Sequence, residues 1–136
     1  MNKLILVAKA VSELSKDTTK VGAIVISKEG LVIGVGVNGY PPGYDDLDTS
    51  YKHDKVIHAE VNALINSRAS RGEVESLYVY GLPPCKDCMK YIAAFLVKEV
   101  HFCVNTDIAS AQDWYVSHNT HKVLHHNIRF IEHENN

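Results

Sequence analysis

Apolar residues recur at helical spacing at the start of the chain and at strand spacing after it. The first segment places apolar side chains three or four positions apart, at Leu4, Val7, Ala8, Val11 and Leu14. This period predicts an amphipathic helix that ends near Ser15. Two runs rich in β-branched residues follow, over 21–27 and 31–37, and the Lys28-Glu29-Gly30 turn between them predicts a hairpin.

Helices and strands are expected to alternate over the rest of the chain. Asn38-Gly39-Tyr40-Pro41-Pro42-Gly43 predicts a loop that continues to about Asp54. The elements expected after it are a helix over 58–68, a strand over 76–81, a helix over 86–97, a strand over 99–104, a broken helix over 109–126 and a strand over 128–132. This order predicts an α/β fold, a three-layer α/β/α sandwich around a five-stranded mixed sheet. Residues 1–136 are expected to form one domain.

Composition and charge narrow the class of partner. The chain has 136 residues, of which 46% are hydrophobic, and its net charge is −2. It contains no cluster of Lys and Arg of the kind that a long nucleic acid requires, because several phosphates must be neutralised on one face. No apolar run reaches the roughly 18–20 residues that cross a bilayer. We therefore expect a soluble, cytoplasmic protein with a small-molecule ligand, no long nucleic acid and no membrane partner.

Cysteine usage points to metal or redox chemistry rather than to a disulfide framework. The chain has only three cysteines, and two of them form a Cys-x-x-Cys pair at Cys85 and Cys88. An odd number with one tight pair fits poorly with a secreted, disulfide-stapled domain. Cys103 lies in an apolar run and is expected to be a small buried hydrophobe.

Two short motifs at predicted helix starts carry the candidate chemistry. One is His58-Ala59-Glu60 and the other is Pro83-Pro84-Cys85-Lys86-Asp87-Cys88. His58, Cys85 and Cys88 provide one imidazole and two thiolates for a zinc ion, and a helix N-terminus favours thiolate over thiol. Three protein ligands leave one tetrahedral position open, which is typical of catalytic zinc. Glu60 follows His58 by only two positions, so we expect it to act beside the ion as general base and acid rather than as a ligand.

Other interpretations of these residues remain open at this point. A Cys-x-x-Cys pair alone also fits a redox site or half of a structural zinc site. His58 alone also fits a partly exposed helix residue, and Asn38 fits the turn of an Asn-Gly loop. Neither the redox nor the structural-zinc interpretation assigns a role to Glu60.

The two motifs taken together resemble a known family. His-x-Glu followed by Pro-Cys-x-x-Cys is the signature of zinc nucleobase deaminases, in which the Glu is not a ligand. Further segments are similar to deoxycytidylate (dCMP) deaminases, from the first helix to the fourth strand. These segments are Ser15-Lys16-Asp17, Val21-Gly22-Ala23, Gly36-Val37-Asn38-Gly39-Tyr40-Pro41, Asp45-Asp46 and His58-Ala59-Glu60-Val61-Asn62-Ala63.

The resemblance implies hydrolytic deamination of dCMP to dUMP, which supplies the precursor of thymidylate. Water activated at one zinc ion per chain would attack C4 of cytosine, and Glu60 would protonate N3. Asn38 would bind the sugar hydroxyl and the backbone N–H of Ala59 would hold the base carbonyl. The loop between the first helix and the first strand would meet the phosphate, and its implied binding residues are Ser15, Lys16 and Thr19.

The resemblance also implies regulation and assembly. Many family members are hexamers switched on by dCTP and off by dTTP, and the corresponding candidate effector loop here is Gly39, Tyr40 and Pro41. We expect a homo-oligomer, either a hexamer or a dimer. Relatives with a second, structural zinc carry Cys where this chain has Tyr44, so one zinc per chain is expected. The family also has a Pro after Ser-Lys-Asp, where this chain has Thr18 in a shorter loop.

Several alternative functions stay compatible with the same zinc core. The substrate could be dCTP or a free cytosine nucleoside instead of dCMP. A tRNA adenosine is disfavoured by the net charge and by the lack of a basic stripe. From a different class, the chain could be a non-catalytic, zinc-stabilised nucleotide-binding module.

Overall fold

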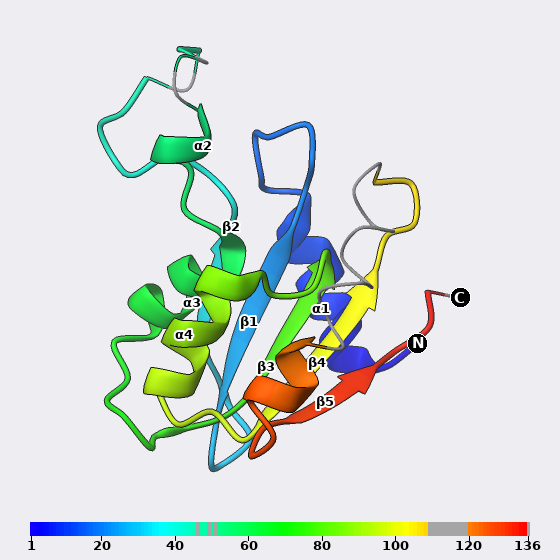
Figure 1. Cartoon of the computed structure of the whole chain (residues 1–136). Helices are drawn as coiled ribbons and strands as arrows, with labels where there is room; N and C mark the ends of the chain where they lie inside the picture. The colour runs from blue at the N-terminus through cyan, green and yellow to red at the C-terminus, as the bar shows by residue number, and fades with distance from the viewer. Residues whose placement is uncertain (46, 49, 51, 109–119, 136) are drawn as a thin grey trace.

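The order of helices and strands follows the alternation expected from the sequence (Figure 1). A computed structural model describes residues 1–45, 47–48, 50, 52–108 and 120–135. Its elements are α1 (Lys3–Ser12), β1 (Gly22–Ser27), β2 (Val32–Val37), α2 (Lys52–Lys55), α3 (Ala59–Ser67), β3 (Val74–Gly81), α4 (Lys86–Ala94), β4 (Glu99–Val104) and β5 (Arg129–Glu132). No helix within these ranges is long and apolar enough to cross a membrane.

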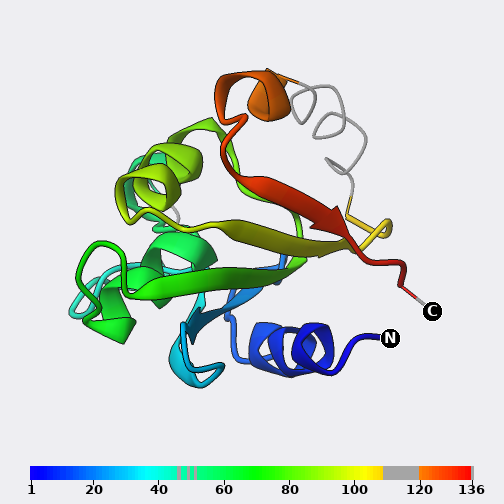
Figure 2. The same cartoon turned by 90° about the horizontal axis from the view of Figure 1, so that it is seen from below.

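The strands form one mixed sheet in the order β2-β1-β3-β4-β5. β1 is antiparallel to both β2 and β3, whereas β3, β4 and β5 are parallel. Figure 2 shows α1 on one face of this sheet and α3 with α4 on the other. The predicted α/β/α sandwich with a five-stranded mixed sheet is therefore confirmed.

Each face of the sheet has its own apolar core. Ile24 and Ile26 of β1 pack in the core on the side of α1, while Ala23 and Val25 pack in the core on the side of α3 and α4. Every residue of β1 is buried, because helices cover both faces of this strand. This burial explains why 21–27 has a continuous apolar sequence rather than an alternating one.

Glycines let the helices lie directly against the sheet. A Cβ atom on Gly22 would meet Ala8 O at 2.4 Å, and one on Gly36 would meet Ala63 N at 2.3 Å. No side chain fits at either position, since real Cβ atoms do not approach backbone atoms this closely. Gly36 therefore brings α3, whose first turn carries the motif with Glu60, into contact with β2.

Several predicted boundaries were wrong, for tertiary reasons. α1 ends at Ser12 rather than near Ser15, because the chain turns so that Ser15 can bond to Asn38. α4 ends at Ala94 instead of continuing to Val97, and Leu96 adopts a left-handed conformation with φ 60°. α2 lies in the segment expected to be a loop. Most of the broken helix expected over 109–126 lies outside the described residues, but 120–124 is helical.

Candidate metal centre

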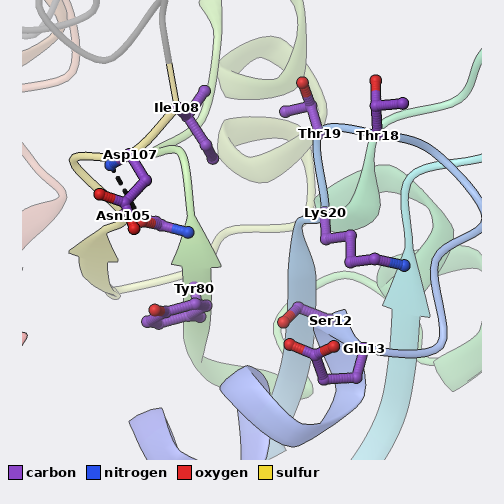
Figure 3. Close-up of a pocket in the computed structure, with 9 residues that line it drawn as sticks. All are labelled: Ser12, Glu13, Thr18, Thr19, Lys20, Tyr80, Asn105, Asp107 and Ile108. Atoms are coloured by element: carbon purple, nitrogen blue, oxygen red, sulfur yellow. Dashed lines mark hydrogen bonds between the residues drawn. The ribbon is translucent and has the colours of Figure 1, made fainter.

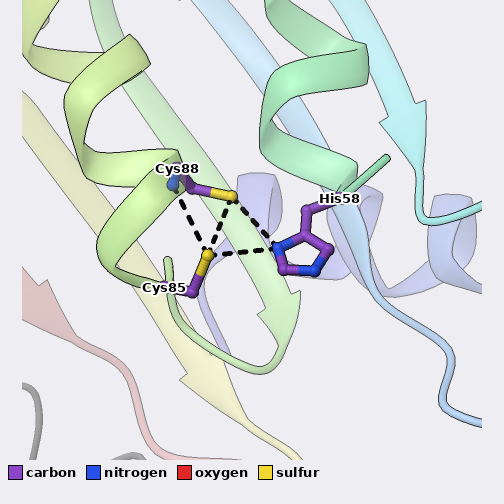
Figure 4. A group of neighbouring side chains, drawn as sticks. All are labelled: His58, Cys85 and Cys88. Carbon is purple, nitrogen blue, oxygen red and sulfur yellow. Dashed lines mark hydrogen bonds between the residues drawn. The ribbon is translucent and has the colours of Figure 1, made fainter. Parts of the chain in front are cut away.

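One imidazole and two thiols converge where α3 and α4 begin (Figure 4). His58 Nδ1 lies 3.2 Å from the Sγ atoms of both Cys85 and Cys88, and the two Sγ atoms are 3.4 Å apart. A disulfide has an S–S length of about 2.05 Å, and all three cysteines of the chain are free. The three predicted ligands therefore share one site whose size suits donors at about 2.0–2.3 Å from a common ion.

The helix termini fix where these three donors point. His58 is the N-cap residue of α3 and Cys85 is the N-cap residue of α4. The Cys88 backbone N–H donates to Cys85 Sγ at 3.4 Å, one turn into the helix. Because unpaired N–H groups and the positive end of the dipole lie at a helix N-terminus, both sulfurs sit where negative charge is stabilised.

The two thiols differ in acidity. The hydrogen bond with Cys88 and the neighbouring His58 lower the pKa of Cys85 to about 4, despite its burial. The hydrogen bond with Cys85, burial and the charge of Glu60 raise the pKa of Cys88 well above its ordinary value. The bond to Cys85 raises the pKa of His58 to about 9. One thiolate is thus present at neutral pH, and a cation must displace protons to bind all three donors.

Glu60 is a buried carboxyl beside the metal centre. It lies in the first turn of α3 with 3% of its surface exposed. Burial raises its pKa to about 7, although the His58 charge and a hydrogen bond to Cys88 act in the opposite direction. A carboxyl with a pKa near the working pH can both accept and donate a proton, which is what general acid and base catalysis requires.

Asn38 joins the end of β2 to the loop between α1 and β1. The residue is 7% exposed, and its Oδ1 accepts from Val21 N at 3.0 Å and from Ser15 Oγ at 2.8 Å. Its Nδ2 donates to Thr19 O at 2.6 Å. The structure therefore brings together three of the predicted substrate-binding residues, namely Ser15, Thr19 and Asn38.

The remaining predicted residues lie around this group. Ala59 is fully buried and opens α3, so its N–H is one of the unpaired donors of the first turn. Lys16 is exposed on the loop. Gly39 pairs with Ile57 in an isolated antiparallel bridge, and Tyr40 donates its hydroxyl to Asp48 O at 2.9 Å. Pro41 lies in the same loop and is half-buried.

A polar cavity of about 320 Å³ opens beside the loop that ends at Lys20 (Figure 3). Its lining residues come from α1, from that loop, from β3 and from the segment after β4: Ser12, Glu13, Thr18, Thr19, Lys20, Tyr80, Asn105, Asp107 and Ile108. Of these residues, only Thr19 is among those predicted from the sequence to bind substrate. No sequence signal marks the others, because they meet only when the carboxyl ends of β3 and β4 are brought to the start of β1.

A family model supports the deaminase motifs. The model for the cytidine and deoxycytidylate deaminase zinc-binding region matches residues 1–104. This range contains His58, Glu60, Cys85 and Cys88 together with the loops described above.

Curated relatives point to the same chemistry. A probable deoxycytidylate deaminase of Caenorhabditis elegans is 37% identical over 110 residues, which are 74% of this chain and 55% of that protein. The deoxycytidylate deaminase of Homo sapiens is 37% identical over 104 residues, which are 67% of this chain and 57% of that protein. The chain thus spans little more than half the length of these relatives.

A solved structure matches nearly the whole chain. It is the crystal structure of dCMP deaminase from the cyanophage S-TIM5 in complex with dCMP and dUMP. The match has a TM-score of 0.68 at 29% identity and covers 95% of this chain and 93% of that one.

Proposed function

The chain belongs to the cytidine and deoxycytidylate deaminase family, and we propose that it catalyses the hydrolytic deamination of dCMP to dUMP and ammonia. The observation that carries this proposal is the convergence of His58, Cys85 and Cys88 next to the buried carboxyl of Glu60. A structural zinc site would not require that carboxyl, whereas a hydrolytic site does, because protons must move between water, base and leaving amine.

The donor set fits zinc. One imidazole nitrogen and two sulfurs are ligands that zinc prefers, and three of them leave a fourth position for water or substrate. When bound there, zinc supplies a Lewis acid that makes water nucleophilic near neutral pH. Among the described residues, His58, Cys85 and Cys88 form the one such group of three, which agrees with one zinc per chain.

Glu60 moves the protons of the reaction. Its carboxylate takes one proton from the attacking water and delivers it to N3 of cytosine as the oxygen adds to C4. It then passes the second proton to the amino group, so that the C4–N bond breaks and ammonia leaves. The raised pKa of Glu60, about 7, suits both directions of transfer.

The residues around Asn38 orient the nucleotide. We assign the sugar hydroxyl to Asn38 and the base carbonyl to the Ala59 N–H at the start of α3. Asn38 is held by Val21 N, Ser15 and Thr19, so its side chain is ordered before substrate arrives. Such preorganisation reduces the entropic cost of binding.

The loop between α1 and β1 is the proposed phosphate site, with Ser15, Lys16 and Thr19 as its donors. Lys16 is exposed, and its positive charge favours an incoming anion. The nearby polar cavity is the poorer candidate, because two carboxylates, Glu13 and Asp107, line it against one lysine, Lys20, and a negative balance of charge disfavours a phosphate.

Regulation and assembly are part of the proposal. The loop of Gly39, Tyr40 and Pro41 is the proposed effector site for dCTP and dTTP, and the chain is expected to assemble as a homo-oligomer, either a hexamer or a dimer. The proposed compartment is the cytoplasm, where thiols stay reduced and available as metal ligands.

A side-by-side assay tests the substrate assignment. Ammonia release is measured for dCMP, deoxycytidine, CMP and dCTP with zinc-loaded protein, with and without dCTP or dTTP as effector. The highest kcat/KM is expected for dCMP. A higher value for deoxycytidine would overturn the phosphate assignment, and zinc binding with no turnover of any of the four would identify a non-catalytic module.

A further inference from the structure

Helix α3 covers the free edge of the sheet with two asparagine side chains. Asn62 Nδ2 donates to Val37 O at 2.8 Å, and one turn later Asn66 Nδ2 donates to Val35 O at 2.8 Å. β2 is the edge strand, and the Asn38 N–H bonds inward to Val21 O. The carbonyls of Val35 and Val37 therefore point outward, since alternate residues of a strand face opposite sides of the ladder.

The close approach of α3 makes these contacts possible. Gly34 and Gly36 of β2 have no space for a Cβ atom, because Ala63 backbone atoms would lie 2.5 and 2.3 Å from it. The short asparagine side chain then spans the remaining distance from the helix to the strand.

Asn62 makes a second contact that Asn66 does not. Its Nδ2 also lies 3.4 Å from Ile57 O. Ile57 pairs with Gly39 through hydrogen bonds of 2.8 and 3.0 Å, in a bridge that stands outside the sheet. One amide group thus touches the two carbonyls that directly precede Asn38 and His58.

We propose that Asn62 is a positioning residue that fixes the distance between the Asn38 backbone and the His58 backbone. The inference rests on the proposed function, in which Asn38 binds the sugar and His58 holds the metal. The 39–57 bridge consists of one residue pair, and within the described residues of the segment that it closes, 40–45, 47–48, 50 and 52–56, the single-turn helix α2 is the one regular element. Asn62 anchors this bridge to α3, the helix that also carries Glu60.

A matched pair of variants tests the proposal. Asn62→Ala removes both contacts, while Asn66→Ala removes the same kind of bond from the same strand without touching the bridge. For Asn62→Ala, kcat/KM for dCMP is expected to fall by about 10- to 100-fold, mostly through KM, since small misplacements of binding groups cost rates of this order. Asn66→Ala is expected to stay within about threefold of the wild type. Both variants are expected to retain zinc.

Combination with an Asn38 variant separates positioning from a general structural effect. In an Asn38→Ala background, Asn62→Ala is expected to reduce kcat/KM further by less than about threefold, because residues that act through one another are not additive. Full additivity, or equal effects of Asn62→Ala and Asn66→Ala, would overturn the proposal.

Amide hydrogen exchange tests the role of Asn62 at the 39–57 bridge independently of turnover. Asn62→Ala is expected to accelerate exchange at the Gly39 and Ile57 amides, and Asn66→Ala is not; unchanged exchange in Asn62→Ala would also overturn the proposal. If the wild-type protein does not deaminate dCMP, the proposed function fails and the exchange data alone decide whether Asn62 holds the bridge. Should Asn62→Ala fail to fold, Asn62→Asp keeps the size of the side chain and replaces the donor with an acceptor.

Discussion

Lys52 of α2 places its Nζ atom 3.1 Å from each carboxylate oxygen of Asp17. This ion pair joins two loops that are 35 residues apart in the sequence and that border the proposed nucleotide site. Burial raises the pKa of Asp17, but hydrogen bonds from Thr19 N and Lys52 outweigh it, so that the pKa lies below its ordinary value. The pair therefore stabilises the loop of the proposed phosphate site at neutral pH.

Removing this ion pair should weaken substrate binding more than folding. Lys52→Met is expected to raise KM for dCMP about threefold with little change in kcat, and to lower the free energy of unfolding by at most about 1 kcal/mol, because Lys52 is partly exposed. The pKa of folded Asp17 is lowered, so its contribution is present above the ordinary carboxyl pKa and is lost as the pH falls through the folded value.

A neighbouring lysine is the control for this prediction. Lys55→Met removes an ion pair in which Lys55 Nζ lies 3.3 Å from Asp48 Oδ2, and the Asp48 side chain is 49% exposed. Neither residue belongs to the loop between α1 and β1. Steady-state kinetics with both variants measure whether KM for dCMP rises in Lys52→Met and not in Lys55→Met. An equal KM for the wild type and Lys52→Met would show that the pair does not order the site.

Glu60→Gln should separate catalysis from metal binding. The amide has the size of the carboxyl but cannot take a proton from water, so kcat is expected to fall by about 10²- to 10⁴-fold. Zinc content and fold should be retained, because Glu60 is not one of the three donors. Ammonia release and metal analysis on the same sample test this. Activity within tenfold of the wild type would assign the proton transfers to another group.

The parts of the site that were predicted from sequence are those set by local spacing. Cys85 and Cys88 lie on the first turn of one helix, and His58 and Glu60 lie at the start of another. Each pair is therefore close in the sequence and can be recognised as a short motif. Likewise, the β-branched runs over 21–27 and 31–37 identified β1 and β2, because strand preference is carried by neighbouring residues in the sequence.

The parts that were missed depend on contacts between distant segments. The Asp17–Lys52 pair has no periodic signature, and α2 is a single turn in a polar loop. The end of α1 is set by the bond from Ser15 to Asn38, 23 residues away. The contacts of Asn62 with Val37 O and Ile57 O could not be predicted, because a helix pattern does not reveal which carbonyls its polar residues meet.

Removal of zinc should abolish turnover reversibly. Treatment with a chelator is expected to stop ammonia release and to lower the melting temperature, and added zinc should restore both at one ion per chain. Zinc binding should weaken as the pH is lowered, because the two thiols and His58 must lose protons to act as ligands. The raised pKa of Cys88 makes its proton the hardest for zinc to displace.

Cysteine variants test which thiols hold the metal. Cys88→Ser is expected to lose zinc and activity together. Cys103→Ala is the control, since Cys103 is fully buried in the core beside α1 and away from the metal centre. Metal analysis after gel filtration measures the zinc content of both variants. A zinc content for Cys88→Ser equal to that of Cys103→Ala would remove Cys88 from the ligand set.

His133, which directly follows β5 and contacts His101 of β4, should make folding sensitive to acid. His133 Nε2 lies 2.9 Å from His101 Nδ1, and His101 Nε2 lies 3.2 Å from Glu99 Oε1. With both rings neutral, His133 donates to His101 and His101 donates to the carboxylate, a proton assignment inferred from the network. Tyr78 stacks on His101 at a centroid distance of 4.1 Å, which leaves little room for rearrangement.

Protonation of His133 favours the unfolded chain. Burial, and then the charge of His101, lower the pKa of His133, so between the folded pKa and the ordinary value near 6.5 the unfolded state binds more protons. The free energy of unfolding is therefore expected to fall as the pH is lowered from 8 through that range. In His133→Gln, whose amide keeps a donor for His101 but does not titrate, this loss should be smaller. Urea titrations at saturating zinc measure both proteins, and equal pH slopes would show that His133 does not carry the effect.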